Sequence, residues 1–178
     1  MSAIVIPAGA TAHAATVTTP DGRFTVVADD EAVWASGWAD NEQQLWGHLG
    51  WAESVQPGKP KPGSALEHAI DAVRAYYKGD FTAVNNVPVR PAAAPFRRAV
   101  HDALRTIPPG QHLSYSQLAA RAGNPEAVRA AGTACGRNAA ALLIPCHRAL
   151  RQDGTLGGFL YGVRIKSSLL SREAAGLP

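Results

Sequence analysis

The spacing of apolar residues along the chain changes after about residue 40. Between residues 15 and 38, short runs rich in Val, Thr, Phe and Trp are separated by turn residues, including an Asp21-Gly22 pair. This pattern is typical of a β-meander. The predicted strands cover 15–19, 24–28 and 32–38. Beyond residue 40, apolar residues recur at helical spacing, which predicts helices for much of the remaining chain.

Residues that begin and end helices bound these segments. Ser64 with Glu67, and Ser114 with Gln117, have the spacing of capping boxes, and Pro95 fits a first helical turn. The predicted helices cover 41–49, 64–78, 95–107, 114–122, 125–135 and 163–175. The fifth is expected to start with Asn124 as N-cap and Pro125 as its first residue. Because a single glycine, Gly123, lies between the end of the fourth and the cap of the fifth, the pair is expected to form a helix-turn-helix, and simple packing is the alternative to DNA binding for this pair.

The length and the charge distribution suggest two halves. A chain of 178 residues suits one domain or two small ones, and the proline-rich stretch 87–95 is typical of a linker. We therefore expect domains at 1–88 and 89–178. The first carries 5 Lys and Arg against 10 Asp and Glu, whereas the second carries 12 against 4. The basic half suggests contact with a polyanion, and an ordinary solvated surface is the alternative.

Other composition features narrow the class of protein. Two cysteines, Cys135 and Cys146, cannot form a disulfide framework, and they are too few for the usual structural zinc site, so no metal is expected. The first residues lack the basic region of a signal peptide, and no apolar run is long enough to span a bilayer. We expect a soluble intracellular protein.

The candidate chemistry lies at residues 139–148. An apolar run ends at Pro145, and Cys146, His147 and Arg148 follow directly. Neighbouring positive charge favours the thiolate, which is the reactive form of cysteine. The alternative is that Cys146 is a small buried apolar residue.

The sequence Ile-Pro-Cys-His-Arg at 144–148 resembles the active-site signature of the O6-alkylguanine-DNA alkyltransferases, also called methylated-DNA–protein-cysteine methyltransferases. The similarity covers about residues 96–176, and extends more loosely to the N-terminal half. It implies an α/β (α+β) fold. A small β-meander plus helix would form a ribonuclease-H-like N-terminal domain, and a mainly helical, winged-helix-like C-terminal domain would carry the helix-turn-helix.

The resemblance also implies a reaction and its catalytic residues. Cys146 would take the alkyl group from O6 of guanine, or O4 of thymine, in one irreversible turnover. His147 would deprotonate Cys146 through a water, and Glu173 would orient His147, as in a hydrolase triad. Asn138 would organise the turn and the thiol.

Two further residues would act on the guanine. Lys166 would lie near its O6 and N1 edge, and Tyr115 would rotate the target phosphate and donate a hydrogen bond to the leaving base. A solvated pair on a surface helix is the alternative for Lys166 and Glu173. The implied substrate pocket comprises Ala149, Phe159, Leu160 and Tyr161, and the bulk of the last two is expected to narrow it.

Arg129 resembles the arginine that enters the base stack when the target nucleotide is extruded, with Ala127 and Ala130 against the minor groove. Arg137 and Arg151 are expected to contact phosphates. The implied partner is double-stranded DNA containing O6-alkylguanine, without cofactor, metal or membrane. A monomer is expected in the bacterial cytoplasm, associated with the nucleoid while acting, and cooperativity on DNA stays open. A cysteine hydrolase and a non-enzymatic binder of alkylated DNA are the alternatives.

Overall fold

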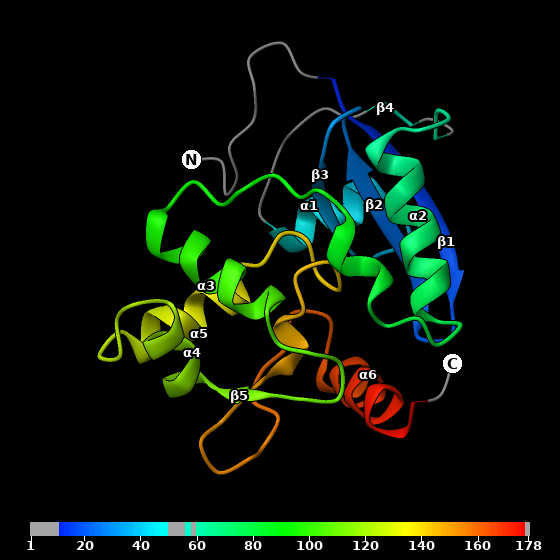
Figure 1. The fold of residues 1–178 in the computed structure, drawn as a ribbon. Helices are drawn as coiled ribbons and strands as arrows, with labels where there is room; N and C mark the ends of the chain where they lie inside the picture. Colours follow the sequence, from blue (N-terminus) through cyan, green and yellow to red (C-terminus); the bar gives the residue numbers. More distant parts are fainter. Residues whose placement is uncertain (1–10, 50–55, 58–59, 177–178) are drawn as a thin grey trace.

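The computed structural model describes residues 11–49, 56–57 and 60–176. Its N-terminal part contains a sheet of the order β3-β2-β1-β4 (Figure 1). The strands are β1 (His13–Thr19), β2 (Gly22–Ala28), β3 (Val33–Trp38) and β4 (Gln56–Pro57). The meander β1-β2-β3 is antiparallel, as expected, and the two-residue β4 adds to β1 in parallel.

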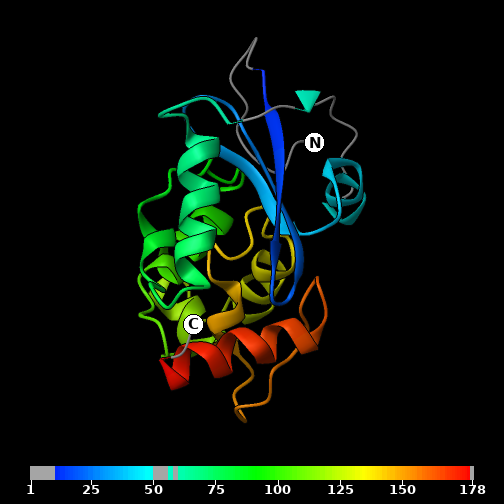
Figure 2. The same ribbon diagram turned by 90° about the vertical axis from the view of Figure 1, so that its right-hand side faces the viewer.

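The sheet is covered on both faces, which is why β3 lacks an apolar–polar alternation. Helix α2 (Ala65–Tyr76) lies against one face and α1 (Glu42–Leu49) against the other (Figure 2). Phe24, Val26 and Val33 pack in the cluster that contains α2, whereas Val27 and Trp34 pack with residues of α1. Every residue of β3 is buried as a result.

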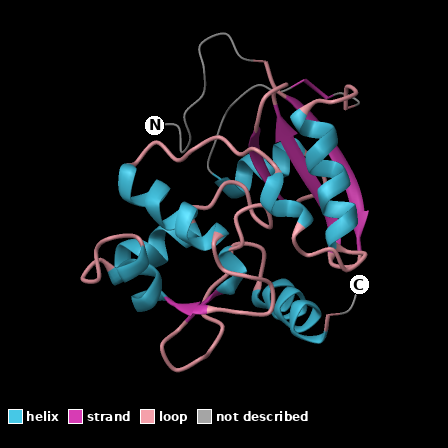
Figure 3. Ribbon diagram, viewed as in Figure 1, coloured by secondary structure: helices cyan, strands magenta, loops and turns pink. Residues whose placement is uncertain are grey.

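The remaining described chain consists mainly of helices and loops (Figure 3). The helices are α3 (Pro95–Arg105), α4 (Tyr115–Arg121), α5 (Val128–Gly136) and α6 (Val163–Ala175), with 3₁₀ turns η1 (Ala83–Asn86) and η2 (Cys146–Arg148). The short strands β5 (Leu113–Ser114) and β6 (Ala149–Leu150) pair in parallel, which sets β6, directly after η2, beside the strand that leads into α4. Within the described ranges, no helix is long and apolar enough to cross a membrane.

Helix caps agree with the sequence at several ends and differ at two. The Ser114–Gln117 capping box is complete, but the Glu67 carboxylate accepts from Gly63 N rather than from Ser64 N. Helix α5 begins at Val128, so the predicted start at Pro125 is wrong. Asn124 carbonyl instead accepts from Ala127 N at 3.1 Å and closes a turn.

Aromatic residues contribute much of the core, in which Trp34, Trp38 and Trp46 are buried. In α2 the buried aromatic residue is Tyr76, and Tyr77 is the C-cap.

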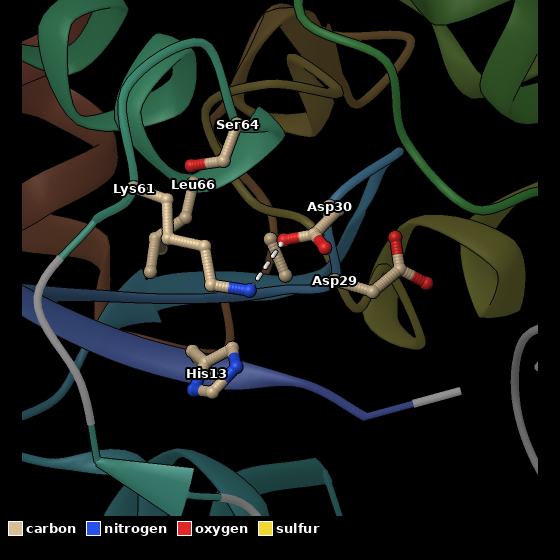
Figure 4. A pocket seen from close by; sticks show the side chains of 7 residues that line it. His13, Asp29, Asp30, Lys61, Ser64 and Leu66 are labelled. Atoms are coloured by element: carbon tan, nitrogen blue, oxygen red, sulfur yellow. Dashed lines mark hydrogen bonds and ion pairs between the residues drawn. The ribbon is translucent and has the colours of Figure 1, made fainter. Parts of the chain in front are cut away.

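Residues 88–90 run along β3 and join the two halves. Val33 N donates to Pro88 O at 2.9 Å, and Arg90 N donates to Val33 O at 2.8 Å. The Arg90 guanidinium also pairs with buried Asp29 at 2.6 Å. Asp29, Asp30, Lys61 and His13 border a small polar pocket beside this junction, in which Lys61 points to Asp30 (Figure 4). The domain boundary at residue 88 stays a prediction, since one apolar cluster contains residues of both halves.

Candidate active site

The loop that carries Cys146, residues 138–146, is held by the edge of β3. Ser36 N donates to Ala139 O at 2.9 Å, and Ala141 N donates to Ser36 O at 3.0 Å. The Ser36 hydroxyl adds a bond to Ala141 O at 2.8 Å. Leu142, which is fully buried, has a φ of 73° at the bend of the loop. The N-terminal sheet therefore sets the path of the chain that leads to the thiol.

Asn138 closes this loop from inside. Its amide nitrogen donates to Ile144 O at 2.8 Å and to Cys146 Sγ at 3.1 Å, and its oxygen accepts from Ala140 N at 3.0 Å. The side chain is buried, so these bonds form away from bulk water. One residue thus fixes both the turn and the sulfur atom.

The thiol of Cys146 is not held as a thiolate by its chain neighbours. Burial raises its pKa, while the bond from Asn138 and the charge of Lys166 act in the opposite direction. The side chains of His147 and Arg148 both face Glu173. The expectation that adjacent positive charge activates the sulfur is therefore corrected, because that charge is neutralised on the other side of η2. The resting group is a buried thiol.

Glu173, on α6, is the centre of a fully buried ion cluster. Its Oε1 atom accepts from His147 Nε2 at 2.8 Å, Arg148 Nη2 at 2.9 Å and Tyr76 Oη at 2.7 Å. Its Oε2 atom accepts from Arg148 Nε at 3.0 Å and from Gly110 N at 3.2 Å. Burial alone would raise the pKa of Glu173, but the hydrogen bonds from His147 and Arg148 and the charge of Arg148 hold it well below its usual range. Glu173 therefore stays ionised.

This carboxylate determines the tautomer of His147. An ionised carboxylate can only accept, so the hydrogen of the neutral imidazole lies on Nε2. Burial lowers the pKa of His147, against the opposing effect of Glu173, and so favours the neutral ring. Nδ1 is then a lone-pair acceptor, buried and without a protein partner in the described chain. His147 is arranged as a base.

On the other side of Cys146 lies a pocket of about 240 Å³. Its lining comes from α4, α5, η2 and the loop before α6, and comprises Tyr115, Gly132, Cys135, Gly136, Cys146, Gly158, Phe159 and Leu160. Gly132 and Gly136 leave space there, because a Cβ atom at either position would meet nothing within 4 Å. Burial raises the pKa of Tyr115 to about 12, so its hydroxyl keeps its proton. The thiol therefore faces a partly apolar pocket.

Of the four residues expected to form the substrate pocket, two line it. Phe159 and Leu160 do, whereas Tyr161 turns toward the N-terminal sheet and packs 5.5 Å from Trp38, between ring centroids. There its ring fills the space above Gly37, where a Cβ atom would lie 2.0 Å from the Tyr161 hydroxyl oxygen. The expected narrowing by the Tyr161 ring is therefore not found. Ala149 is fully buried and contributes its carbonyl group elsewhere.

Lys166 is fully buried and anchors two loops. Its ammonium donates to Ala149 O at 2.7 Å and to Leu156 O, and lies 6.0 Å from the ring centroid of Tyr115. Burial lowers its pKa, and the nearby thiols act against this. The alternative of a solvated surface pair is wrong, because both Lys166 and Glu173 are buried.

The residues expected to meet DNA lie on the outside of the C-terminal half. Arg129 and Ala130 are exposed near the start of α5 and Ala127 is half-buried. Arg137 and Arg151 are exposed close to the ends of the loops that border the pocket. Val128, also exposed, adds an apolar side chain to this surface.

Several site residues were missed from the sequence. Tyr76 and the Gly110 amide bind Glu173, and Cys135 lines the pocket beside Cys146. Helical periodicity could have placed Tyr76 on a buried face of α2, one turn after Val73, but not against a residue 97 positions later.

Comparison with known proteins agrees with this geometry. Residues 95–175 match the family described as "6-O-methylguanine DNA methyltransferase, DNA binding domain". A methylated-DNA–protein-cysteine methyltransferase of Haemophilus influenzae is 42% identical over 154 residues, which cover 86% of this chain and 82% of that protein. The chain belongs to the methylated-DNA–protein-cysteine methyltransferase family.

Two other relatives extend the comparison. The crystal structure of Mycobacterium tuberculosis OGT in complex with DNA superposes with a TM-score of 0.77 at 29% identity, covering 93% of this chain and 95% of that one. The bifunctional transcriptional activator/DNA repair enzyme Ada of Escherichia coli is 36% identical over 86% of this chain. The chain spans only 43% of the length of Ada.

Proposed function

We propose that the protein repairs alkylated DNA by moving the alkyl group from O6 of guanine to its own Cys146. The observation that carries this proposal is the position of the thiol. Cys146 borders the 240 Å³ pocket on one side, and its chain neighbour His147 is bound to Glu173 on the other. A nucleophile next to an oriented base is the arrangement that activates a thiol.

The proposed step balances with groups of this chain. The thiol proton passes to Nδ1 of His147 through a water, and the sulfur attacks the alkyl carbon. The carbon–O6 bond breaks as the carbon–sulfur bond forms. Tyr115, which lines the pocket and keeps its hydroxyl proton, would give that proton to the guanine, which then leaves as the neutral base. Lys166, 6.0 Å from the centroid of the Tyr115 ring, would stabilise the negative charge left on Tyr115. Asn138 keeps the sulfur aligned, at 3.1 Å. The thioether has no route back to a thiol, so each chain acts once.

DNA is the proposed partner. An alkyl group on O6 lies inside the duplex, so the nucleotide must be extruded to reach a pocket. Arg129 would fill the resulting gap from α5, while Ala127 and Ala130 allow close approach to the minor groove. The ribonuclease-H-like and winged-helix-like descriptions, transfer from O4 of thymine, the monomeric state and the nucleoid location belong to this proposal as well.

Intact-mass measurement after incubation with O6-methylguanine DNA tests the proposal. One added methylene per chain is expected, on the peptide that contains Cys146, with no further repair afterwards. Cys135→Ala is the matched control, since it removes the other pocket thiol and should still accept the group, whereas Cys146→Ala should not. Repeated turnover would favour a cysteine hydrolase, and binding without added mass would favour a non-enzymatic damage binder.

A further inference from the structure

Tyr76 is the residue through which the N-terminal half reaches the Glu173 cluster. It ends α2, is fully buried, and donates its hydroxyl to Glu173 Oε1 at 2.7 Å. Both ribbon views place the C-terminal end of α2 beside the C-terminal end of α6, which carries Glu173 (Figures 1 and 2). This hydrogen bond joins residues 97 positions apart.

The hydroxyl competes with His147 for the same oxygen atom. Oε1 accepts from Tyr76, His147 and Arg148, within 2.7–2.9 Å. A carboxylate oxygen has about two lone-pair sites, so three donors use its capacity fully. Each bond from Tyr76 and Arg148 reduces the negative charge that Oε1 presents to the imidazole.

The charged and titratable groups around this atom are few. Arg148 on η2 and Lys166 on α6 disfavour a charged His147, and Glu173 favours it. On α2, burial raises the pKa of Tyr76 far above neutrality, and Glu173 and Tyr77 act in the same direction. Tyr76 is therefore a neutral donor at every working pH.

We propose that Tyr76 is a positioning residue of the alkyl-transfer site, whose hydroxyl fixes the Glu173 carboxylate and limits the charge that it presents to His147. This inference rests on the proposed function, in which His147 must be neutral to accept the thiol proton. Without the hydroxyl, Glu173 would stabilise the imidazolium more strongly. His147 would then be protonated at a higher pH and would lose its function as a base there.

The chain provides a matched control in the next residue. Tyr77 also donates its hydroxyl to a carboxylate, Asp21 Oδ2, at 2.8 Å, and its ring lies 5.4 Å from that of Tyr76. Tyr77→Phe and Tyr76→Phe therefore remove the same group from neighbouring sites, and only Tyr76→Phe touches the Glu173 cluster.

The test measures single-turnover methyl transfer from O6-methylguanine duplex DNA as a function of pH. For Tyr76→Phe, the acid limb of the rate profile should move up by about one pH unit, with about tenfold slower transfer on that limb. Above the limb the rate should stay within about twofold of wild type. Tyr77→Phe should follow the wild-type profile.

A second readout does not need DNA. The pKa of His147, followed by NMR in the three proteins, should be higher in Tyr76→Phe alone. Superposable profiles and equal His147 titrations in both variants would overturn the inference. So would an equal loss in both variants at every pH, which would indicate a packing role. If the wild type transfers no methyl group, the proposed function fails instead, and the NMR titration still decides whether Tyr76 controls His147.

Discussion

The two sides of Cys146 are built in opposite ways. On the Glu173 side, His147, Arg148 and Glu173 have fully buried side chains, and both carboxylate oxygens are bound by several donors. On the pocket side, Tyr115 and Phe159 are half-buried and Leu160 is exposed, around a 240 Å³ space. The first side holds a proton acceptor in one geometry, whereas the second must admit a substrate. Substitutions on the Glu173 side should therefore strongly lower the stability and the rate of methyl transfer. Substitutions on the pocket side should change the transfer rate by smaller amounts.

The largest effect is expected from Glu173→Gln. The change leaves the buried Arg148 guanidinium without its counter-charge, which typically lowers the free energy of unfolding by about 3–5 kcal/mol. His147 also loses its orienting partner, so methyl transfer should slow by about a hundredfold or more. Denaturant unfolding and single-turnover rates measure the two losses. Glu126→Gln, at an exposed position, is the control. If Glu173→Gln lost no more stability and transfer rate than Glu126→Gln, the Glu173 side would not be the more sensitive side.

The loss of stability in Glu173→Gln should also depend on pH. Because the folded pKa of Glu173 is held below its ordinary value of 4.5, its stabilising contribution is complete above that value. The contribution is lost as the pH falls through the lower folded pKa. The stability deficit of Glu173→Gln should therefore be constant near neutrality and shrink in acid. A deficit that persists unchanged in acid would show that ionisation is not its cause.

Gly37→Ala should disturb the pocket side from a distance. Its new Cβ atom would lie 2.0 Å from the Tyr161 hydroxyl oxygen, so the ring must move and displace the neighbouring Phe159 and Leu160. Transfer should slow by about tenfold, an intermediate effect. Adding Tyr161→Ala removes the collision and should restore much of the rate. Gly47→Ala, where a Cβ atom meets nothing within 4 Å, is the control. Additive losses in the double variant would disprove the coupling.

Arg129→Ala separates DNA opening from the chemistry. Repair of duplex DNA should fall by about tenfold, whereas reaction with free O6-methylguanine should be nearly unchanged, because only the duplex requires base extrusion. Arg74→Ala, exposed on α2, serves as the control for loss of charge. Equal losses on the duplex and the free base would place Arg129 outside the extrusion step.

Leu160→Ala should have the smallest effect on the natural reaction. Leu160 lines the pocket and is 39% exposed, so shortening it enlarges the entrance without opening a core cavity. Reaction with O6-benzylguanine should speed up by about threefold, and methyl transfer should change less than twofold. Val163→Ala, also exposed but outside the pocket lining, is the comparison. Equal gains in both variants would mean that Leu160 does not limit the substrate.

Local signals allowed much of the fold to be predicted. The complete Ser114–Gln117 capping box, Pro95 at the start of α3 and the bounds of α6 all follow from residues close in sequence. The start of α5 could not be predicted in this way. Ala127 N, which the side chain of an Asn124 cap would bind, instead donates to Asn124 O and closes a turn.

The site was predictable only where a motif marks it. The resemblance pointed to Cys146, His147 and Glu173, which the structure brings together, but not to the state of the thiol, because burial and the position of Glu173 decide it. Ser36 and Tyr76 carry no local signal of function. Their roles depend on hydrogen bonds to residues about a hundred positions further along the chain, which periodicity cannot reveal.

The hydrogen bonds of Ser36 to Ala141 also bear on when the active centre forms during folding. The meander β1-β2-β3 closes through short-range contacts, whereas the Ser36–Ala141 bond spans 105 residues. Contacts of long sequence separation require the closure of large loops, and they form late. A chain still under synthesis can therefore fold its sheet before the thiol loop docks on the edge of β3. The loop that carries the nucleophile is therefore expected to assemble late, and a truncated chain lacking α6 would keep Cys146 and His147 but lose Glu173, the carboxylate that orients His147.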